Sequence, residues 1–590
     1  MKWKVWMGWA LLVPTMMLAQ TTKLAPELKL TASEQSIPVI VQYKPAVSAS
    51  KVKIVAGVSA AAQLTVINGV RVVVPASALA SLAADPNVAY VSPDRPVRGL
   101  LNNSAPAVLA NYAWGLGLDG THVGVAVIDS GIHDSHDLSQ TGGSRIKASL
   151  DYTGDGLDDG YGHGTHVAGI IGGSGFDSMC STCNVAIRGI APNVDLISFR
   201  VLNNNGDGNE SAVIQAIQDA IQLKSAYNIR VLNLSVGRPV YESYNQDPLC
   251  RAAEQAWKAG IVVVVSAGNN GRDNTYGSYG YGMIESPGND PYVITVGAMN
   301  AKGTPDRGDD VMTSYSAKGP TVIDRIVKPD IVAPGNRVVS LYAPALLEAQ
   351  NPQNQVPFSY FESDGSQEPS GSYFVLSGTS MAAGMVSGAA ALLVQNDPTL
   401  TPDQVKARLM KTAYKKLPRY VAIIDNGQTY TEQADVFTVG AGYLDVQAAL
   451  LNKDRAPGAA KSPVAVFDTA SGNVYFAVDS QTPWGMAAIF KSYSGAPSTS
   501  TWDTTVVWGS DAFLPGTPPS GSSAMWGSSA MWGSSAMWGS SAMWGSSAMW
   551  GNSAMWGNSA MWGNSAMWGN SAMWGNSAMW GNRVLISGEN

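Results

Sequence analysis

The stretch VGVAVIDSGI, Val123–Ile132, passes through small and β-branched apolar residues to a carboxylate and then a turn. A short continuous apolar run of this kind is typical of a strand that is buried on both faces, as in a parallel sheet. Similar runs recur at Val194–Leu202, Val231–Gly237 and Gly260–Gly271, and helical patterns separate them. This alternation predicts an α/β domain with a mostly parallel sheet between helices. Its ligand site is expected at the carboxyl ends of the strands.

Three segments that are far apart in the chain carry an acid, an imidazole and a hydroxyl. They are VAVIDSGI with Asp129, GHGTHVAG with His163 and SGTSMAAG with Ser380. A serine hydroxyl is a weak nucleophile at neutral pH until an imidazole accepts its proton, and a carboxylate orients that imidazole. Taken singly, the segments can be a strand end, a turn histidine and a polar loop. Their combination, in this order, favours nucleophilic catalysis.

In their residues and their order along the chain, these segments resemble those of the subtilisin-like serine proteases, and the resemblance covers roughly Ala105–Leu451. The resemblance implies a three-layer subtilisin-like domain and an endopeptidase that hydrolyses peptide bonds of proteins or peptides through an acyl-enzyme. It implies that Ser380 is the nucleophile, that His163 is the general base and then the acid, and that Asp129 orients the imidazole.

The oxyanion site follows from the same resemblance. The segment GIVVVVSAGNNG resembles the family's turn in which an asparagine side chain donates to the developing oxyanion, and that position is Asn269. The backbone N–H of Ser380 is the expected second donor. Asn270, the neighbouring amide, is the alternative interpretation as a simple turn residue.

The resemblance also places the substrate along glycine-rich segments. Ser235 and Gly237 are expected as walls of the specificity pocket, and Gly206 and Gly208 lie in a loop expected to pair with an extended peptide. Gly268 is a further expected contact. The small residues that end at Gly268 leave room for a large apolar side chain before the scissile bond.

The segments before the protease-like region predict export and a zymogen. Residues 1–19 combine lysines, a short apolar stretch and a final alanine, which is typical of a secretory signal peptide and predicts an extracellular protein. Residues 20–103 resemble the inhibitory propeptide of the family, expected as a small α+β ferredoxin-like domain that inhibits its own chain. The catalytic domain is expected over 104–452, after a maturation cut between Arg98 and Ala105.

The composition changes after the protease-like region. Residues 453–521 are interpreted as a linker or a small β-rich segment, and 583–590 as a short tail. Between them, residues 522–582 repeat Ser-Ala-Met-Trp-Gly-(Ser/Asn) with a period of six that carries ten tryptophans. Either a disordered Gly/Ser-rich chain, favoured by the lack of β-branched residues, or a stacked β-solenoid fits the pattern. Both suit contact with a surface, glycan or polymer.

The cysteines are few. Cys180 and Cys183 form a C-x-x-C pair that favours a short-loop disulfide in an exported protein, with Cys250 left as a buried thiol or as an alternative partner. A zinc site needs four ligands, and the sequence has no second pair. The net charge of −7 and the lack of basic runs argue against a nucleic-acid partner, and no apolar run after the signal peptide is long enough for a membrane span.

No cofactor is required by this chemistry, although members of the family bind structural calcium. Asp137 lies close to a familiar ligand position, one residue short in spacing. An acidic turn is the alternative source of calcium ligands, and a plain solvated turn is the competing interpretation of it. The acidic residues of that turn are Asp155, Asp158 and Asp159.

The chain departs from the family in two places. Gly384 and Met385 stand where the family has Pro-His, in the helix after the nucleophile, and residues 341–373 form a long polar insertion before it. The insertion is interpreted either as a border of the substrate cleft or as a surface loop. A second functional hypothesis is a surface-associating protein whose tryptophan repeats act, while its protease domain cleaves only its own propeptide.

Overall fold

The computed structural model of the chain describes residues 23–24, 28, 36–44, 59–64, 68–93, 104–140, 143–274, 278, 280–363, 365–418, 420–425, 428–456, 458–468, 473–477, 507–508 and 588–589. Its contacts divide the chain into two compact units, Met1–Arg98 and Gly99–Asn590, each with its own hydrophobic core. The expected signal peptide and the tryptophan repeats lie outside the described residues.

The first unit is a small antiparallel sheet in the order β2-β3-β1-β4, with the helix α1 (Leu79–Ala84) between β3 and β4. Alternate residues of β3 are buried, as expected for a strand with one face on a core. The strands are β1 Ser36–Tyr43, β2 Ser59–Leu64, β3 Gly69–Pro75 and β4 Val88–Pro93. The ferredoxin-like topology stays a prediction, because residues 45–58, between β1 and β2, lie outside the described residues.

The second unit is built on an eight-stranded sheet in the order β13-β12-β11-β10-β5-β9-β8, with β14 paired to β12. Its pairs are parallel except β12 with β13. These directions confirm the expected mostly parallel sheet, and every residue of β5 and β11 is buried, as expected for its central strands. The strands are β5 Gly124–Asp129, β8 Ile146–Asp151, β9 Asp195–Arg200, β10 Ile229–Leu234, β11 Val262–Ser266, β12 Ile294–Asn300, β13 Val311–Met312 and β14 Ile331–Pro334.

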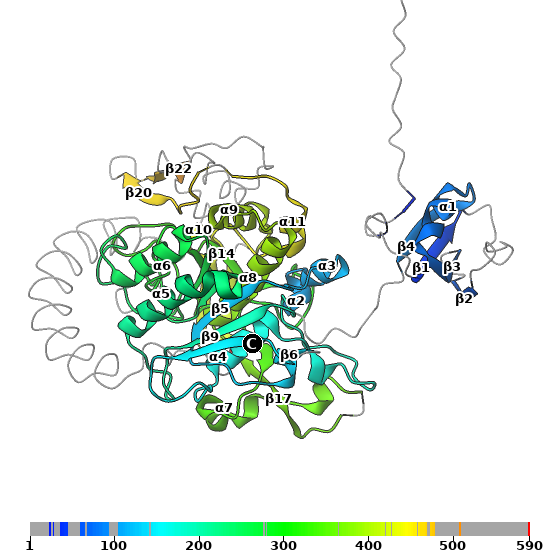
Figure 1. Ribbon diagram of the computed structural model, residues 1–590. Helices are drawn as coiled ribbons and strands as arrows, with labels where there is room; N and C mark the ends of the chain where they lie inside the picture. Colours follow the sequence, from blue (N-terminus) through cyan, green and yellow to red (C-terminus); the bar gives the residue numbers. More distant parts are fainter. Residues whose placement is uncertain are drawn as a thin grey trace, which may run out of the picture. The chain divides into compact units, whose positions relative to one another are not determined.

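Helices cover both faces of this sheet (Figure 1). On one face, α4 (His163–Gly172) packs against α8 (Thr379–Asn396), and α8 contacts β10, β11 and β12. On the other, α5 (Glu210–Tyr227) packs against α6 (Pro248–Lys258). A Cβ at Gly384 would lie 3.0 Å from a methyl group of Ile170 in α4, so the glycine lets the two helices approach closely.

Smaller elements surround the three layers. The helix α11 closes the region expected as the catalytic domain, and β20, β21 and β22 form a three-stranded sheet within residues 453–521. These elements are α2 Ser104–Ala107, α3 Ala110–Gly115, β6 Ser139–Gln140, β7 Gly143–Ser144, α9 Pro402–Thr412, β18 Tyr420–Asp425, β19 Gln428–Gln433, α10 Val436–Val439, α11 Val446–Leu451, β20 Val464–Asp468, β21 Asn473–Ala477 and β22 Val507–Trp508.

The insertion at 341–373 is not the polar loop that the sequence suggested. Within it lie the helix α7 (Leu346–Gln350), the strand β16 (Gln355–Pro357) and the start of β17 (Pro369–Leu376), which pairs with both β16 and β15 (Val338–Leu341). Leu347 and Glu348 in α7 are buried in the second unit. Strand pairing between distant segments leaves no local signal in a polar sequence, so these strands could not be predicted from it.

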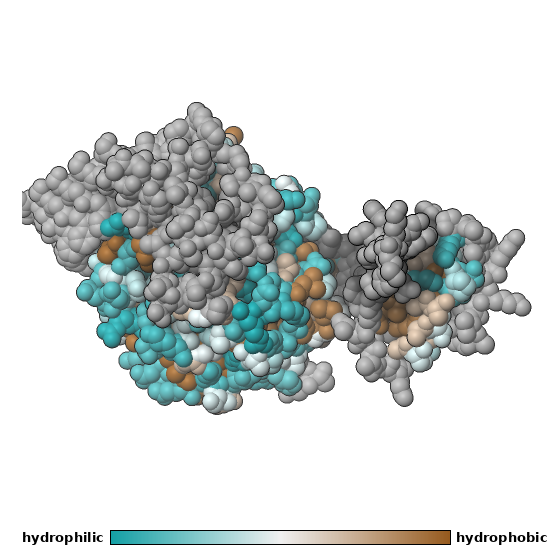
Figure 2. Space-filling view, turned by 90° about the horizontal axis from the view of Figure 1, so that it is seen from above, coloured by the Kyte–Doolittle hydropathy of each residue, from teal (hydrophilic) through white to brown (hydrophobic). Residues whose placement is uncertain are grey.

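The surface in Figure 2 is mostly hydrophilic where the described residues are visible, with hydrophobic residues scattered among them. The exposed large apolar side chains include Leu157, Phe176 and Ile424, which come from separate segments. Scattered apolar residues are ordinary on a protein surface. Among the described residues, none of the helices combines the length and the hydropathy that a membrane crossing would need.

The parallel strands and the two helices bring distant segments to one edge of the sheet. Asp129 is the last residue of β5, His163 is the first residue of α4, and Ser380 is the second residue of α8. The turns after β10 and β11 end at the same edge, because both strands run parallel to β5 and its neighbours. This edge is the one that the sequence predicted for the ligand site.

Candidate active site

Asp129 and His163 form a short hydrogen bond in the interior of the protein. The Nδ1 of His163 lies 2.7 Å from Oδ1 of Asp129, and both side chains are almost completely buried. The backbone N–H of Ser130 donates to the same carboxylate oxygen at 2.8 Å. A carboxylate only accepts hydrogen bonds, so the proton is on Nδ1 and the lone pair of Nε2 is available to accept another.

Burial and charge act in opposite directions on His163. Burial by itself lowers the pKa of this imidazole, but the negative charge of Asp129, the hydrogen bond to it and the charge of Asp159 outweigh burial, so the pKa is raised. The neighbouring His166 has no such partner: burial and the charge of His163 lower its pKa to about 3. His166 therefore stays neutral, and its Nε2 bonds backbone carbonyl oxygens.

Ser380 lies in the first turn of α8, with its side chain nearly buried. Its Oγ donates a long hydrogen bond, 3.5 Å, to the carbonyl oxygen of Ser235, rather than to His163. Catalytic hydrogen bonds are often long or misaligned until substrate binds, and a serine side chain has three staggered rotamers. Ser235, expected as a pocket wall, thus contacts the candidate nucleophile directly.

Thr379 holds the expected oxyanion residue beside the start of α8. The side-chain oxygen of Asn269 accepts hydrogen bonds from the N–H and the hydroxyl of Thr379, at 2.9 and 3.1 Å. The N–H of Gly268 donates to the same hydroxyl at 3.2 Å. With its oxygen held in this way, Asn269 presents its NH₂ group toward Gly378, where an added Cβ would lie 3.2 Å from Nδ2.

Two further expected substrate residues, Gly206 and Gly208, lie in the loop between β9 and α5. Gly206, with φ of +81°, packs against the ring of Tyr161, and Gly208 pairs with Leu202 in an isolated bridge after β9. Tyr161 is only two residues before His163 in the chain. These glycines therefore belong to the border of the site rather than to a distant surface.

A carboxylate that the sequence did not indicate lies against Gly237, an expected pocket wall, and Gly268, a further expected substrate contact. A Cβ on Gly237 would be 2.7 Å from Oε2 of Glu285, and a Cβ on Gly268 would be 2.8 Å from its Cδ. Asn270 donates to the other oxygen of Glu285 at 2.6 Å. No motif marks this glutamate, because it reaches the site only when the segment after β11 folds back and its N–H bonds Ala267.

Glu348 is a second buried carboxyl that was not anticipated. It comes from α7 in the insertion and lies against Gly162, the residue before His163, where a Cβ would be 2.0 Å from Oε2. Gly162 has φ of +104°, so both its conformation and its neighbour require glycine. Burial, with the nearby charge of Asp159, raises the pKa of Glu348 to about 8. This carboxyl is consequently neutral at pH 7.

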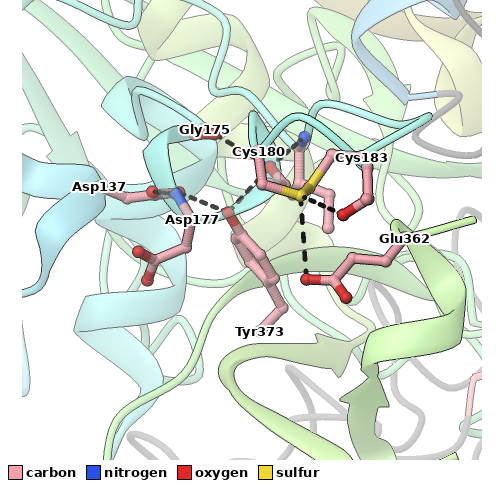
Figure 3. The surroundings of a disulfide bond; sticks show 10 residues. Asp137, Gly175, Asp177, Cys180, Cys183, Glu362 and Tyr373 are labelled. Carbon is pink, nitrogen blue, oxygen red and sulfur yellow. Dashed lines mark hydrogen bonds between the residues drawn. A yellow bond between two sulfur atoms is a disulfide. The ribbon is translucent and has the colours of Figure 1, made fainter. Parts of the chain in front are cut away.

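The cysteines pair as the sequence favoured. Cys180 and Cys183 form a disulfide, and Cys250 is a buried free thiol. Burial raises the pKa of the Cys250 thiol well above its ordinary value. Figure 3 shows the disulfide beside Glu362, which lies within the insertion at residues 341–373. In the described residues, these two cysteines and Glu362 are the group with metal-ligand geometry, but disulfide sulfurs are not thiolate ligands.

The carboxylate of Asp137 does not fit the expected calcium site. It is fully buried, and its two oxygens accept hydrogen bonds from the hydroxyl of Tyr373 at 2.9 Å and the N–H of Asp177 at 2.8 Å (Figure 3). Burial raises its pKa to about 6. Calcium is bound by roughly six to eight oxygen ligands. Both oxygens of Asp137 are instead occupied by hydrogen-bond donors of the protein.

The carboxylates of the acidic turn also bind other groups of the protein. Asp159 accepts hydrogen bonds from the N–H groups of Tyr161, Gly162 and Thr165 before and within α4. Asp158 pairs with His133, at 3.0 Å. The acidic residues of the turn therefore point to different partners and not toward a shared cation.

Comparison with known proteins gives the same picture as the geometry. Residues 120–442 match the Subtilase family. The chain is similar to Serine protease AprX of Bacillus subtilis (strain 168), with 38% identity over 348 residues, which is 56% of this chain and 71% of that protein.

Two subtilisins are also similar. Subtilisin DY of Bacillus licheniformis shares 32% identity over 345 residues, covering 58% of this chain and 96% of that protein. Subtilisin E of Bacillus subtilis (strain 168) shares 30% identity over 396 residues, covering 66% of this chain and 82% of that protein.

The raised pKa of His163 gives a direct test of the site. In the Ser380→Ala protein we expect His163 to titrate above the ordinary histidine value of about 6.5, as followed by NMR of labelled histidines. In Asp129→Asn the charge is lost while burial remains, so the imidazole should titrate below that value. Asp134→Asn removes an exposed carboxylate five residues after Asp129 and serves as the matched control. A His163 pKa that Asp129→Asn leaves unchanged would contradict this electrostatic account.

Proposed function

The chain belongs to the subtilase family and is a subtilisin-like serine endopeptidase, and on that premise we propose which residues perform its reaction. Ser380 Oγ attacks the carbonyl carbon of a peptide bond while Nε2 of His163 accepts its proton. His163 then gives this proton to the leaving amine, and an acyl-enzyme remains. Water, deprotonated by the same nitrogen, releases the acyl group and restores Ser380.

The observation that carries this proposal is the buried 2.7 Å hydrogen bond between Asp129 and His163. It fixes the tautomer in which Nε2 can act as base, and it stabilises the imidazolium that forms during attack. Burial strengthens the effect, because charges interact more strongly where water is excluded. The chemistry uses only side chains and water, so it requires no cofactor.

We propose Asn269 and the backbone N–H of Ser380 as the oxyanion donors. The N–H groups in the first turn of a helix lack intrahelical acceptors, which leaves that of Ser380 able to donate. Thr379 holds the oxygen end of the Asn269 amide and so directs its NH₂ end toward the start of α8. Donors fixed in advance stabilise the transition state without reorganisation, typically by about 3 kcal/mol each.

We propose that the protein is exported and made as a zymogen. The lysine-led apolar stretch at residues 1–19 supports export. The separate compact unit that ends at Arg98 supports an inhibitory propeptide, because it directly precedes the protease unit. A large sheet of non-local contacts folds slowly, which favours a segment that assists folding and restrains activity. The role of the tryptophan repeats in surface attachment stays part of this proposal.

Removing the nucleophile tests the reaction. Ser380→Ala should abolish labelling by a serine-directed fluorophosphonate and lower casein hydrolysis by at least about a thousandfold, because both require the same hydroxyl. Ser366→Ala, at an exposed serine, is the matched control and should behave like the unmodified chain. Persistent labelling of the Ser380→Ala protein would show that another residue is the nucleophile.

The same pair of proteins separates general proteolysis from self-processing. If the unmodified chain loses its first unit, as shown by mass spectrometry, but does not hydrolyse casein, the protease acts only on itself. The surface-associating function would then be the better account.

Glu285 indicates a preference for a basic residue before the scissile bond. Its carboxylate lies against Gly237, an expected wall of the pocket, and Gly268, an expected substrate contact, and it is half-buried. The bond from its N–H to Ala267 and the bond that it accepts from Asn270 fix its position. A pocket of this kind suits the cation of lysine or arginine better than the large apolar side chain suggested by the small residues alone.

This preference can be measured with quenched peptides that differ only in the residue before the cut. We expect kcat/KM for lysine or arginine to exceed that for leucine by about tenfold or more, since a hydrogen bond to a charged group contributes roughly 1.5–3 kcal/mol. Glu285→Gln should remove that difference, whereas Glu368→Gln, at an exposed carboxylate, should preserve it. A leucine preference in the unmodified protein would contradict the proposed role of Glu285.

A further inference from the structure

Two residues that follow the tryptophan repeats lie within the second unit. Gly588 and Glu589 are among the described residues, and Glu589 is 1% exposed although a charged side chain is rarely buried without partners. The contacts of Glu589 reach residues 253 to 317 positions earlier in the sequence.

One oxygen of the Glu589 carboxylate accepts hydrogen bonds from three donor groups. Arg272 donates to Oε1 at 2.7 Å, the N–H of Ser314 donates to Oε1 at 3.0 Å, and the hydroxyl of Ser314 donates to the same oxygen. An ion pair with several hydrogen bonds is the arrangement that makes a buried carboxylate tolerable. These donors come from two loops of the protease unit.

The backbone of Glu589 is recognised as well as its side chain. Asn336 donates from Nδ2 to the carbonyl oxygen of Glu589 at 2.7 Å and accepts from its N–H at 2.8 Å. This side-chain amide therefore satisfies both polar groups of one peptide residue, as a neighbouring strand would. Asn336 follows β14, so a rigid element positions it.

The residue before Glu589 must be small. Gly588 has φ of +64°, and a Cβ there would lie 2.5 Å from Oγ of Ser377 and 2.7 Å from Cγ of Arg337. Ser377 is three residues before the proposed nucleophile. The contact surface thus selects a glycine followed by a glutamate.

The docking surface is held in place by contacts of its own. Arg272 also donates to Asp425 at 2.7 Å and to Ser314 Oγ at 2.7 Å, and its guanidinium lies 4.3 Å from the centre of the Tyr430 ring. A cation oriented by other partners loses little freedom on binding an anion. The surface therefore has the properties of a site arranged in advance for a carboxylate.

We propose that Arg272, Ser314 and Asn336 form a docking site for the Gly588–Glu589 segment of the same chain. The near end of the tail is attached too, since the N–H of Ala465 bonds Arg325 at 2.8 Å and Ser462 bonds buried Asp330. Described residues on both sides of the tryptophan repeats are then bound to the protease unit. A cut between these two attachments would leave both parts bound together.

The test uses the full chain with Ser380→Ala, which cannot cut itself, and with a recognition sequence for an unrelated site-specific protease placed between residues 511 and 521. After cleavage, gel filtration with light scattering should give one complex with the mass of a single chain. Glu589→Ala, which removes the buried anion, should release the repeat fragment. Gly588→Val should do the same through its collision with Ser377, while Glu368→Ala should leave the complex intact.

Each other outcome would overturn the proposal. Release of the repeat fragment while Glu589 is present would show that the docking contact does not hold it. Retention in both Glu589→Ala and Gly588→Val would show that the repeats hold themselves. A complex with the mass of two chains would show that the segment docks on a second copy. None of these readouts uses catalysis, so they are separate from the tests of the proposed catalytic residues.

Discussion

The parallel pairing of β5 with β9 and β10 is the constraint on which the site depends. Parallel strands place all their carboxyl ends on one edge, so Asp129 at the end of β5 meets the turns that follow β10 and β11 there. The helices α4 and α8 begin at the same edge and pack against each other. Their first turns carry His163 and Ser380, so residues far apart in sequence gather without any flexible segment having to place them.

This arrangement buries charges, and their partners decide whether it is stable. Burying an isolated ion lowers the free energy of unfolding by roughly several kcal/mol, whereas an ion with a close counter-charge and hydrogen bonds is tolerated. Asp129 is balanced by the imidazole of His163, which keeps the pair ready for proton transfer. Glu348 takes the other course, because burial without a cation raises its pKa and leaves it neutral beside Gly162. The same physics thus produces a carboxylate hydrogen-bonded to an imidazole and a neutral carboxyl within one site.

The sequence was most informative where chemistry and structure are both local. The apolar runs identified the buried strands, and the segments around Asp129, His163 and Ser380 could be selected because each motif is contiguous. The C-x-x-C disulfide was predictable for the same reason.

Other features depended on distant contacts. Glu285 lies in no motif and reaches Gly237 and Gly268 only by chain folding. The insertion was misjudged as a polar loop because β17 pairs with β15 and with β16, and a polar strand has no distinctive period when its partner is unknown. Asp137 looked like a calcium ligand, but its donors come from residues 40 and 236 positions away.

The most direct test of the account is a crystal structure of the protein after reaction with a peptidyl phosphonate, which leaves a tetrahedral adduct on the nucleophile. The account predicts a bond to Ser380 Oγ, an adduct oxygen within hydrogen-bonding distance of Asn269 Nδ2 and the N–H of Ser380, and His163 still bonded to Asp129. An adduct on another residue, or an oxygen directed away from both donors, would contradict it.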